Sequence, residues 1–127
     1  MCTITPSAKV ILPLDSHAPK VARNFLTQAL CVAHHAGVRD EAELLVSELI
    51  TNGVRYGAAP LVMQLICEGP AGLRISVSDA GPGEPAPRQA GIDDESGRGM
   101  TLVDVLSKEW GVEASEAGKT VWCCLAS

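Results

Sequence analysis

The sequence predicts an α+β protein in which a mixed, mostly antiparallel sheet packs against helices on one of its faces. Two observations support this prediction. Apolar periodicity marks three helical and five strand-like segments, and these do not follow one another in a regular strand–helix–strand order. A hairpin signal near the middle of the chain also favours antiparallel pairing. A two-layer α/β sandwich is the simplest architecture for such a series, and 127 residues suffice for one domain, residues 1–127, with its own core.

The composition is that of a water-soluble globular protein. Hydrophobic residues make up 46% and charged residues 20% of the chain, and no apolar run approaches the roughly eighteen residues of a membrane span. The first ten residues lack the basic and apolar segments of a signal peptide, so we expect a cytoplasmic protein. A net charge of −5, with ten Lys and Arg in total, argues against a nucleic-acid role based on phosphate neutralisation. Proteins or small molecules are the expected partners.

The cysteines indicate neither disulfides nor a metal site. There are five, an odd number, at positions 2, 31, 67, 123 and 124, and they include no Cys-x-x-Cys pair. Cys123 and Cys124 are adjacent, so in a strand they point to opposite faces and would chelate one metal ion poorly. We expect reduced thiols.

A short strand and a first helix are predicted on the N-terminal side. The apolar run Lys9–Leu14 contains Pro13, which confines the run to a sheet edge or to the end of a strand. Apolar residues then recur every three or four positions from about Pro19 to Ala36, which predicts an amphipathic helix. The Asp15–Ser16 pair is placed to cap this helix.

The second predicted helix is the segment around which the rest of the chain is organised. It runs from Glu41 to Gly57, with Asp40 as the expected N-cap and Glu43 completing a capping box. Gly53 lies inside it and should destabilise it by about 1 kcal/mol relative to Ala, a plain loss unless a ligand or another chain needs the room. Its apolar residues recur at helical spacing and should form a buried face: Leu45, Val46, Leu49, Ile50 and Val54.

Strand signals dominate after this helix. Two alternating segments, Leu61–Glu68 and Leu73–Ser78, are separated by Gly-Pro-Ala-Gly and predict an antiparallel hairpin. Residues 79–99 are rich in Gly and Pro and too long for an ordinary connection, so we expect a loop that is disordered or functional. A helix at Met100–Leu106, a strand from Trp110 to about residue 113 and a final antiparallel strand at Thr120–Leu125 complete the prediction.

Two polar side chains interrupt the apolar pattern of the second helix. Glu48 and Asn52 are four residues apart, which places them one turn apart on the same side of the helix. A glutamate can polarise a hydroxyl or take its proton, and an asparagine oxygen can ligate Mg²⁺. Taken alone, the pair also fits a solvated polar edge of an amphipathic helix.

Two glycine patterns accompany this pair. Asp79-x-Gly81-x-Gly83 directly follows a strand; its carboxylate can accept a hydrogen bond from an exocyclic amine, and its glycines let a planar ring approach the backbone. Gly97-x-Gly99 opens a helix whose free N–H groups favour a phosphate chain. Each pattern alone also fits a plain turn or a flexible helix entry. Their order around a long loop describes amine, magnesium and phosphate contacts for ATP.

These segments resemble the sequence boxes of the GHKL superfamily, which comprises gyrase, the Hsp-ninety chaperones, histidine kinases and MutL. Glu48–Asn52 resembles the N box, Asp79–Gly83 the G1 box and Gly97–Val103 the G2 box. The runs VSELITN, GRGMTLV and GKTVW look most like the branch of anti-sigma-factor serine kinases and their stand-alone ATP-binding relatives. The resemblance spans about Val10 to Leu125 and implies the Bergerat ATP-binding fold.

The resemblance implies a role for each matching residue. Asn52 would ligate the Mg²⁺ that bridges the ATP phosphates, and Glu48 would be the catalytic base that orients the hydroxyl of a protein serine. Asp79 would bind the adenine amine, with Gly81 and Gly83 shaping the adenine pocket. The other implied nucleotide contacts are Gly97, Arg98, Gly99, Met100 and Thr120.

The same resemblance makes residues 84–98 an ATP lid, which we expect to be mobile when the site is empty. Arg98 can offer a guanidinium fork to the γ-phosphate. The chain departs from many relatives in carrying Gly53 after the asparagine and Tyr56 where a histidine is common. Tyr56 keeps the aromatic bulk but does not become charged near neutral pH.

Two classes of function stay open at this point. As an enzyme, the chain would be an ATP-dependent protein serine kinase that inactivates an anti-anti-sigma partner and so regulates a sigma factor. As a binding module, it would sequester a sigma factor or another regulator, with ATP as a conformational ligand or with no nucleotide. Intact Glu48 favours the kinase, and a G2 box with only two glycines favours the module. A sensor histidine kinase fragment is disfavoured because His34 and His35 lie on the wrong helix. The family also suggests a homodimer.

Overall fold

A five-stranded antiparallel sheet organises the part of the chain that the computed structural model describes, residues 7–30, 36–69, 72–81, 102–115 and 118–126. The spatial order of the strands is β1-β2-β3-β5-β4, and every neighbouring pair is antiparallel. The strands are β1 (Ser7–Leu12), β2 (Leu61–Cys67), β3 (Leu73–Asp79), β4 (Glu109–Ser115) and β5 (Gly118–Leu125).

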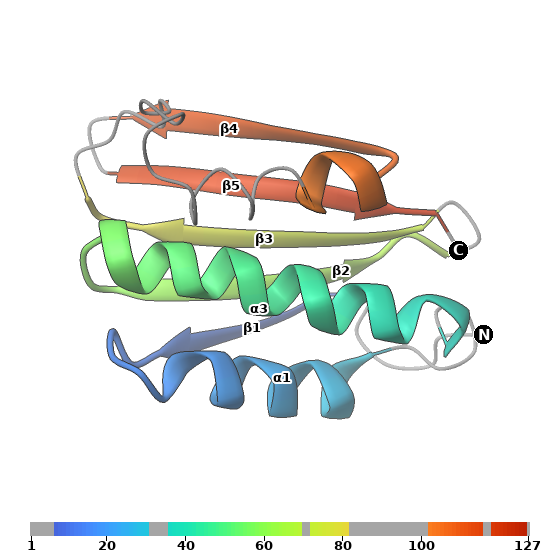
Figure 1. The fold of residues 1–127 in the computed structure, drawn as a ribbon, viewed down its shortest axis with the longest axis horizontal. Coiled ribbons are helices and arrows are strands. Elements are labelled where there is room, and N and C mark those ends of the chain that lie inside the picture. The colour runs from blue at the N-terminus through green and yellow to red at the C-terminus, as the bar shows by residue number, and fades with distance from the viewer. Residues whose placement is uncertain (1–6, 31–35, 70–71, 82–101, 116–117, 127) are drawn as a thin grey trace.

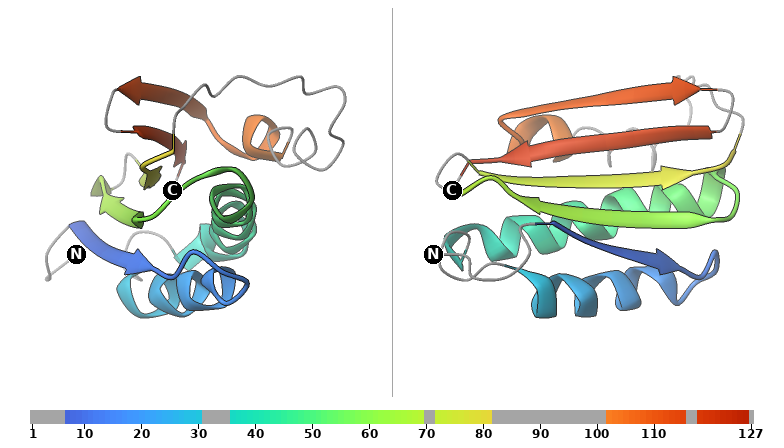
Figure 2. Two further views of the ribbon diagram at one scale, coloured as in Figure 1. Left: turned by 90° about the vertical axis from the view of Figure 1, so that its left-hand side faces the viewer. Right: turned by 180° about the vertical axis from the view of Figure 1, so that it is seen from behind.

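Two helices, α1 (Ala18–Ala29) and α3 (Arg39–Tyr56), lie on the same face of this sheet (Figure 1). The end-on view in Figure 2 shows the sheet as one layer and both helices as the other. The prediction of an α+β sandwich with helices on one face is confirmed. The hairpin of β2 and β3 is confirmed as well, and β1 lies at a sheet edge, as Pro13 indicated.

The core forms where the helices meet the alternating strands. In β3 every second side chain is buried, so Leu73, Ile75 and Val77 face the helices. The helices contribute residues at three- and four-residue spacing, which places them on one stripe. The buried helical residues are Ala18, Ala22 and Leu26 in α1 and Ala42, Leu45, Val46, Leu49 and Ile50 in α3. Each such leucine or isoleucine stabilises the fold by about 1.5–3 kcal/mol through burial.

The first helix is shorter than the sequence pattern predicted. α1 ends at Ala29, and Leu30 takes an extended conformation with ψ 133 while its N–H still donates to the carbonyl oxygen of Leu26. The apolar spacing at Val32 and Ala33, which had extended the prediction to Ala36, lies outside the described residues. A short 3-10 turn, η1 (Ala36–Val38), leads into α3.

The predicted capping box of α3 is also wrong. The helix begins at Arg39, one residue before the expected cap, and its N-cap Val38 makes no side-chain hydrogen bond. Asp40 therefore lies in the first turn, where a carboxylate still favours the positive end of the helix dipole. Glu43 pairs with Arg39 at 3.7 Å, one turn away. At α1, Asp15 accepts a hydrogen bond from the N–H of the N-cap His17 at 2.8 Å.

Gly53 has a packing role that the sequence did not reveal. It is buried, and a Cβ atom at this position would lie 2.7 Å from Cδ1 of Leu61, the first residue of β2. Leu61 is itself fully buried. The missing side chain lets β2 start directly against α3, so the interpretation of Gly53 as a plain loss of helix stability was wrong.

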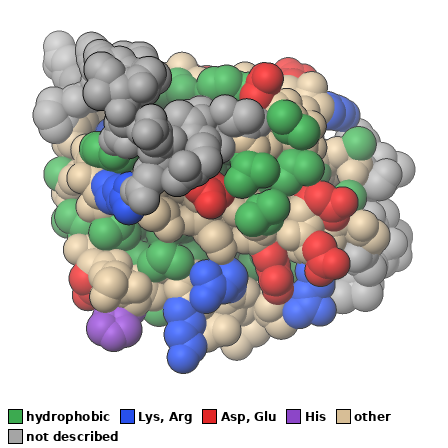
Figure 3. Space-filling view, viewed as in Figure 1, with side chains coloured by type: hydrophobic (Ala, Val, Ile, Leu, Met, Phe, Trp, Pro, Cys, Tyr) green, Lys and Arg blue, Asp and Glu red, His purple; other side chains and the backbone are tan. Residues whose placement is uncertain are grey.

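A helical turn at residues 102–106 includes the last two residues of the G2-like segment, Leu102 and Val103. Val103 is fully buried, and the indole N–H of Trp110 in β4 donates to Oδ1 of Asp104 at 2.9 Å, which ties the turn to the sheet. Figure 3 shows apolar side chains on this face of the molecule, with acidic and basic side chains beside them. The exposed large apolar residues include Leu44, which is 43% exposed, and Val105, which is 69% exposed. No helix in the described ranges is long and apolar enough to cross a membrane.

Candidate functional site

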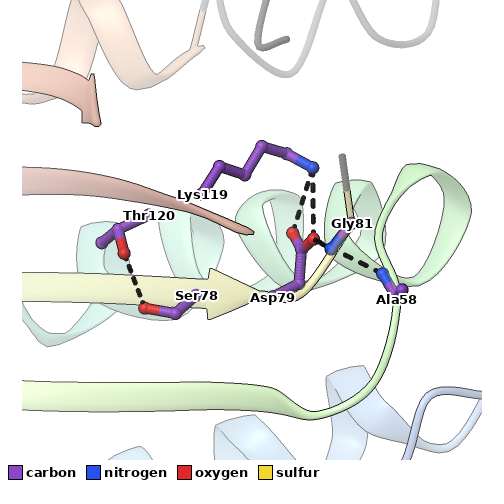
Figure 4. A network of polar contacts seen from close by, with 6 residues as sticks. All are labelled: Ala58, Ser78, Asp79, Gly81, Lys119 and Thr120. Atoms are coloured by element: carbon purple, nitrogen blue, oxygen red, sulfur yellow. Dashed lines mark hydrogen bonds and ion pairs between the residues drawn. The ribbon is translucent and has the colours of Figure 1, made fainter. Parts of the chain in front are cut away.

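The buried carboxylate of Asp79, at the end of β3, is the centre of the candidate site. Its side chain is 4% exposed. Oδ1 accepts hydrogen bonds from the backbone N–H of Gly81 at 2.7 Å and, more weakly, of Ala58 at 3.4 Å. The N–H of Ala80 donates to the carbonyl oxygen of Ala58 at 2.9 Å. Asp79 therefore joins the end of β3 to the connection that leaves α3 (Figure 4).

Three glycines allow other chain segments to approach Asp79 closely. A Cβ atom at Gly57 would lie 2.5 Å from Cγ of Asp79, and one at Gly81 would lie 2.9 Å from Oδ1. Gly118, the first residue of β5, has φ +142 and would place a Cβ against the carbonyl oxygen of Asp79. Backbone instead of side chains therefore lies against the carboxylate at two points, Gly57 and Gly81, which suits the edge of a planar ring.

A lysine that the sequence analysis did not single out, Lys119, lies beside this carboxylate. The pairing of β3 with β5 places Lys119 opposite Asp79 and Thr120 opposite Ser78. Because successive residues of a strand point to opposite faces, Thr120 lies on the face away from Asp79. Its Oγ1 is 2.8 Å from Oγ of Ser78. Nζ of Lys119 lies 3.2 Å from Oδ2 and 3.3 Å from Oδ1 of Asp79.

The parity of the two strands was the signal that could have found Lys119. Asp79 ends the buried series of β3, so any residue paired with it shares its face. With the pairing of Gly118–Leu125 unknown, the sequence did not show which residue of this segment faces Asp79, and the resemblance implied only that Thr120 contacts the nucleotide. No sequence pattern predicted the hydrogen bond from the backbone N–H of Ala58 to Asp79.

Glu48 and Asn52 lie on α3 and are both half-buried. As residues four apart on a helix, their Cβ atoms are about 5–6 Å from each other. Asn52 precedes Gly57 by five residues, or about 7.5 Å along the helix axis. The tie between Ala58 and Asp79 thus brings the end of α3 that follows Asn52 to the end of β3. The C-terminal end of α3 therefore lies beside Asp79, whereas Glu48 lies near the middle of this helix.

The remaining predicted contacts lie outside the described residues. These are Gly83, Gly97, Arg98, Gly99 and Met100, together with the predicted lid at residues 84–98. Gly81 is described, buried, and bonded to Asp79 as given above. Among the described residues no group of three or more His, Cys, Asp and Glu side chains is placed to hold a metal ion.

The adjacent cysteines of β5 are both buried thiols. Cys123 is fully buried and packs in the core, and burial raises its pKa from 9.0 to about 11. Burial also raises the pKa of Cys124. Because the thiolate is the reactive form, neither residue is suited to nucleophilic or redox chemistry at neutral pH.

This fold, with a buried carboxylate at the end of a strand and polar side chains on the neighbouring helix, is that of a nucleotide-binding ATPase domain. Residues 12–125 match the model of the histidine kinase-like ATPase domain family. The chain belongs to this family.

One curated relative and two solved structures are similar to this chain. A Streptomyces coelicolor protein named uncharacterized protein SCO4941 is 42% identical over 52 residues, covering 39% of this chain and 50% of that protein. The crystal structure of the RsbU and RsbW domains of Rv1364c from Mycobacterium tuberculosis matches 96% of this chain and 32% of that one, with a TM-score of 0.72 and 20% identity. The histidine kinase domain of the blue-light activated kinase EL346 from Erythrobacter litoralis matches 69% of this chain and 44% of that one, with a TM-score of 0.55 and 23% identity.

At these identities the two solved structures establish the fold, which is the Bergerat fold that the sequence boxes implied. The alignments span half of the curated relative and less than half of either solved chain. The activities and partners of those larger proteins therefore do not carry over to this chain directly.

Proposed function

We propose that the chain binds ATP with Mg²⁺ and transfers the γ-phosphoryl group to a serine of an anti-anti-sigma partner, thereby regulating a sigma factor. The observation that carries this proposal is the position of the buried Asp79. Its carboxylate lies against the end of α3, the helix that bears Glu48 and Asn52, in a chain of the histidine kinase-like ATPase family. In this proposal the acceptor for the adenine amine lies against the end of α3, and the candidate magnesium and base residues lie on the same helix.

Each residue would act through its own chemistry. Asp79 would accept a hydrogen bond from the adenine amine, against the glycine backbone of Gly57 and Gly81. The amide oxygen of Asn52 would be the one protein ligand of Mg²⁺, an ion that keeps phosphate oxygens and waters as its other ligands. Glu48, one turn away, would orient the serine hydroxyl and take its proton.

When bound, ATP supplies the phosphoryl group, and the transfer depends mainly on positioning and charge neutralisation. In this proposal Gly97, Arg98, Gly99 and Met100 meet the phosphates, and Thr120 stays a predicted contact.

The partners are proposed on two grounds. The sequence runs around Glu48 and Gly97 resemble anti-sigma-factor kinases, and a solved structure that contains an RsbW domain shares the fold over 96% of this chain. We propose a cytoplasmic protein that contacts an anti-anti-sigma factor and a sigma factor and that forms a homodimer. Neither nucleic acid nor membrane contact is part of the proposal.

Calorimetric titration of ATP, with and without Mg²⁺, tests the nucleotide site. The wild type should bind ATP more tightly with Mg²⁺, and Asn52→Ala should remove the magnesium-dependent part. Glu48→Gln should bind ATP normally but fail to phosphorylate the partner, since it keeps the shape of the side chain and loses the base. Thr51→Ala, a substitution of a half-buried neighbour on the same helix, serves as the matched control. Absence of binding at millimolar ATP would reject the proposal.

A second candidate function is protein binding without catalysis. The observation that favours it is the ion pair of Asp79 with Lys119, because the carboxylate is then engaged by the chain itself. Normal binding of the partner by Glu48→Gln, together with no phosphoserine produced by the wild type, would favour this module.

A further inference from the structure

Groups of the chain itself already bind the carboxylate of Asp79, which is expected to accept a hydrogen bond from the base amine. An ionised carboxylate offers about four acceptor positions. In Asp79, Oδ1 has contacts with the N–H of Gly81 at 2.7 Å, the N–H of Ala58 at 3.4 Å and Nζ of Lys119 at 3.3 Å. Oδ2 lies 3.2 Å from the same Nζ. An exocyclic amine that binds here must therefore replace or share one of these donors.

Lys119 is the donor that can leave. The N–H groups of Gly81 and Ala58 belong to backbone whose position is fixed by the end of β3 and by the chain that follows α3. The ammonium group of Lys119 stands on a four-carbon stem with free rotation, and its side chain keeps 15% exposure to solvent. Among the described residues Lys119 is also the only partner of Oδ2, the oxygen that no backbone N–H holds.

The position of Lys119 is fixed by the sheet. β3 and β5 pair Asp79, the last residue of β3, with Lys119 near the start of β5, so both side chains lie on the helical face of the sheet. Figure 4 shows the lysine reaching from the start of β5 over to the carboxylate. The pair is well shielded from water, so the attraction is stronger than that of an exposed pair.

We propose that Lys119 sets the affinity of the site for amine-bearing bases, because the base amine has to displace its ammonium group from Oδ2 of Asp79. This inference rests on the proposed function, since it assumes that the base binds at Asp79. The proposed function names residues that favour nucleotide binding, and this inference names one, Lys119, that opposes it. Lys119 thus competes with the ligand, and a neutral side chain of similar length should relieve the competition.

Substitution Lys119→Met tests this directly. Adenosine is the first probe because it carries the amine and no phosphate, so loss of a positive charge does not weaken a phosphate contact. We expect Lys119→Met to bind adenosine about tenfold more tightly than the wild type, which is the scale of one hydrogen bond to a charged group. Inosine has a carbonyl oxygen in place of the amine, so its affinity should be the same for Lys119→Met as for the wild type. Lys119→Arg keeps an ion pair with Asp79 and should bind adenosine about as the wild type does.

The outcomes separate the two proposals. Adenosine affinity that is unchanged or weaker in Lys119→Met, with ATP bound by the wild type, would overturn the role of Lys119 and leave the proposed function intact. If neither the wild type nor Lys119→Met binds ATP or adenosine, both the proposed function and the role of Lys119 are overturned. A gain for adenosine and inosine alike would also overturn the role of Lys119, because relief would then not depend on the amine.

A measurement on the wild type covers the case in which Lys119→Met does not fold. The chain has four lysines, Lys9, Lys20, Lys108 and Lys119, so ¹³C labelling of the lysine ε-carbons gives a simple spectrum. The signal of Lys119 is assigned by its loss in Lys119→Arg. Saturating adenosine should shift this signal more than the other three. A Lys119 signal that stays in place while adenosine binds would show that the ion pair persists, contrary to the proposal.

Discussion

Among the described residues, Cys123 has the pKa that is shifted furthest from its ordinary value. Its side chain lies on the face of β5 that packs in the core. Burial raises its pKa from 9.0 to about 11, so the folded chain keeps a neutral thiol where the unfolded chain ionises. The stabilisation is fully present below pH 9, and it is lost as the pH rises from 9 through about 11. Two pKa units correspond to about 3 kcal/mol. We predict that the free energy of unfolding falls over this range.

Urea denaturation between pH 7 and pH 10.5 measures this loss, and Cys123→Ala should lose less stability over the interval than the wild type. Cys67→Ala, a substitution of a half-buried thiol in β2, is the matched control for the removal of a thiol. Parallel curves for the wild type and Cys123→Ala would show that this thiol does not titrate differently on folding.

At the residue scale the sequence identified candidate residues, but it did not identify the contacts that they make in the fold. Asp79 and Gly81 were identified as candidates because an aspartate followed by glycines after a strand indicates an acceptor next to open backbone. Lys119 was missed because its meaning depends on which residue of β3 it faces, and this register is fixed by hydrogen bonds between strands forty residues apart. Side-chain partners across a sheet depend on register, and a shift of one residue reverses every face.

At the element scale, the contact of α3 with β2 depends on Gly53. Alanine at this position would favour the helix by about 1 kcal/mol. Its Cβ, however, would lie 2.7 Å from Cδ1 of the buried Leu61, and overpacking of this kind costs about 1–3 kcal/mol. We predict that Gly53→Ala lowers the free energy of unfolding by about 1 kcal/mol, measured by urea denaturation.

A double-mutant cycle isolates this contact. In a Leu61→Ala background the clash is gone, so Gly53→Ala should become stabilising, as helix propensity alone dictates. If Gly53→Ala has the same effect in both backgrounds, the glycine does not serve to admit Leu61.

Elements with a strong local pattern were predicted well, and their ends were not. α3 and the β2–β3 hairpin were found because long periodic runs and turn chemistry act over a few residues. The end of α1 was missed because Val32 and Ala33 continue the apolar spacing, while the chain turns extended at Leu30. The N-cap of α3 was misplaced by two residues, at Asp40 instead of Val38, since Arg39 can take the first helical position as well as Glu41.

At the scale of the whole molecule, the strand order could not be derived from the sequence. The order β1-β2-β3-β5-β4 places the last strand between β3 and β4, so β5 reaches Asp79 and β4 forms the edge. The local pattern of β4 and β5 predicted that they pair with each other and was silent on which of them joins β3. The two-layer α+β architecture followed from the series of elements, whereas the neighbours of the site followed from this topology.

The proposed ATP site exists only in the folded chain, because α3, β3 and β5 each contribute to it. A ligand that binds only the folded state stabilises it by mass action, by about 2.7 kcal/mol at one hundred times its Kd. For a chain of this size that corresponds to a rise in Tm of about 10 °C. We predict a rise on this scale with ATP and Mg²⁺, followed by circular dichroism.

Variants identify the source of the shift, each compared with its own Tm without ligand. Asn52→Ala should keep the part of the shift that ATP gives without Mg²⁺ and lose the rest. Asp79→Asn should lose nearly all of the rise in Tm. The asparagine side chain is neutral, and its amide oxygen would face Lys119, so it no longer offers a charged acceptor to the adenine amine. An equal rise in Tm for Asp79→Asn and the wild type would place ATP elsewhere on the fold, even though the chain belongs to an ATPase family.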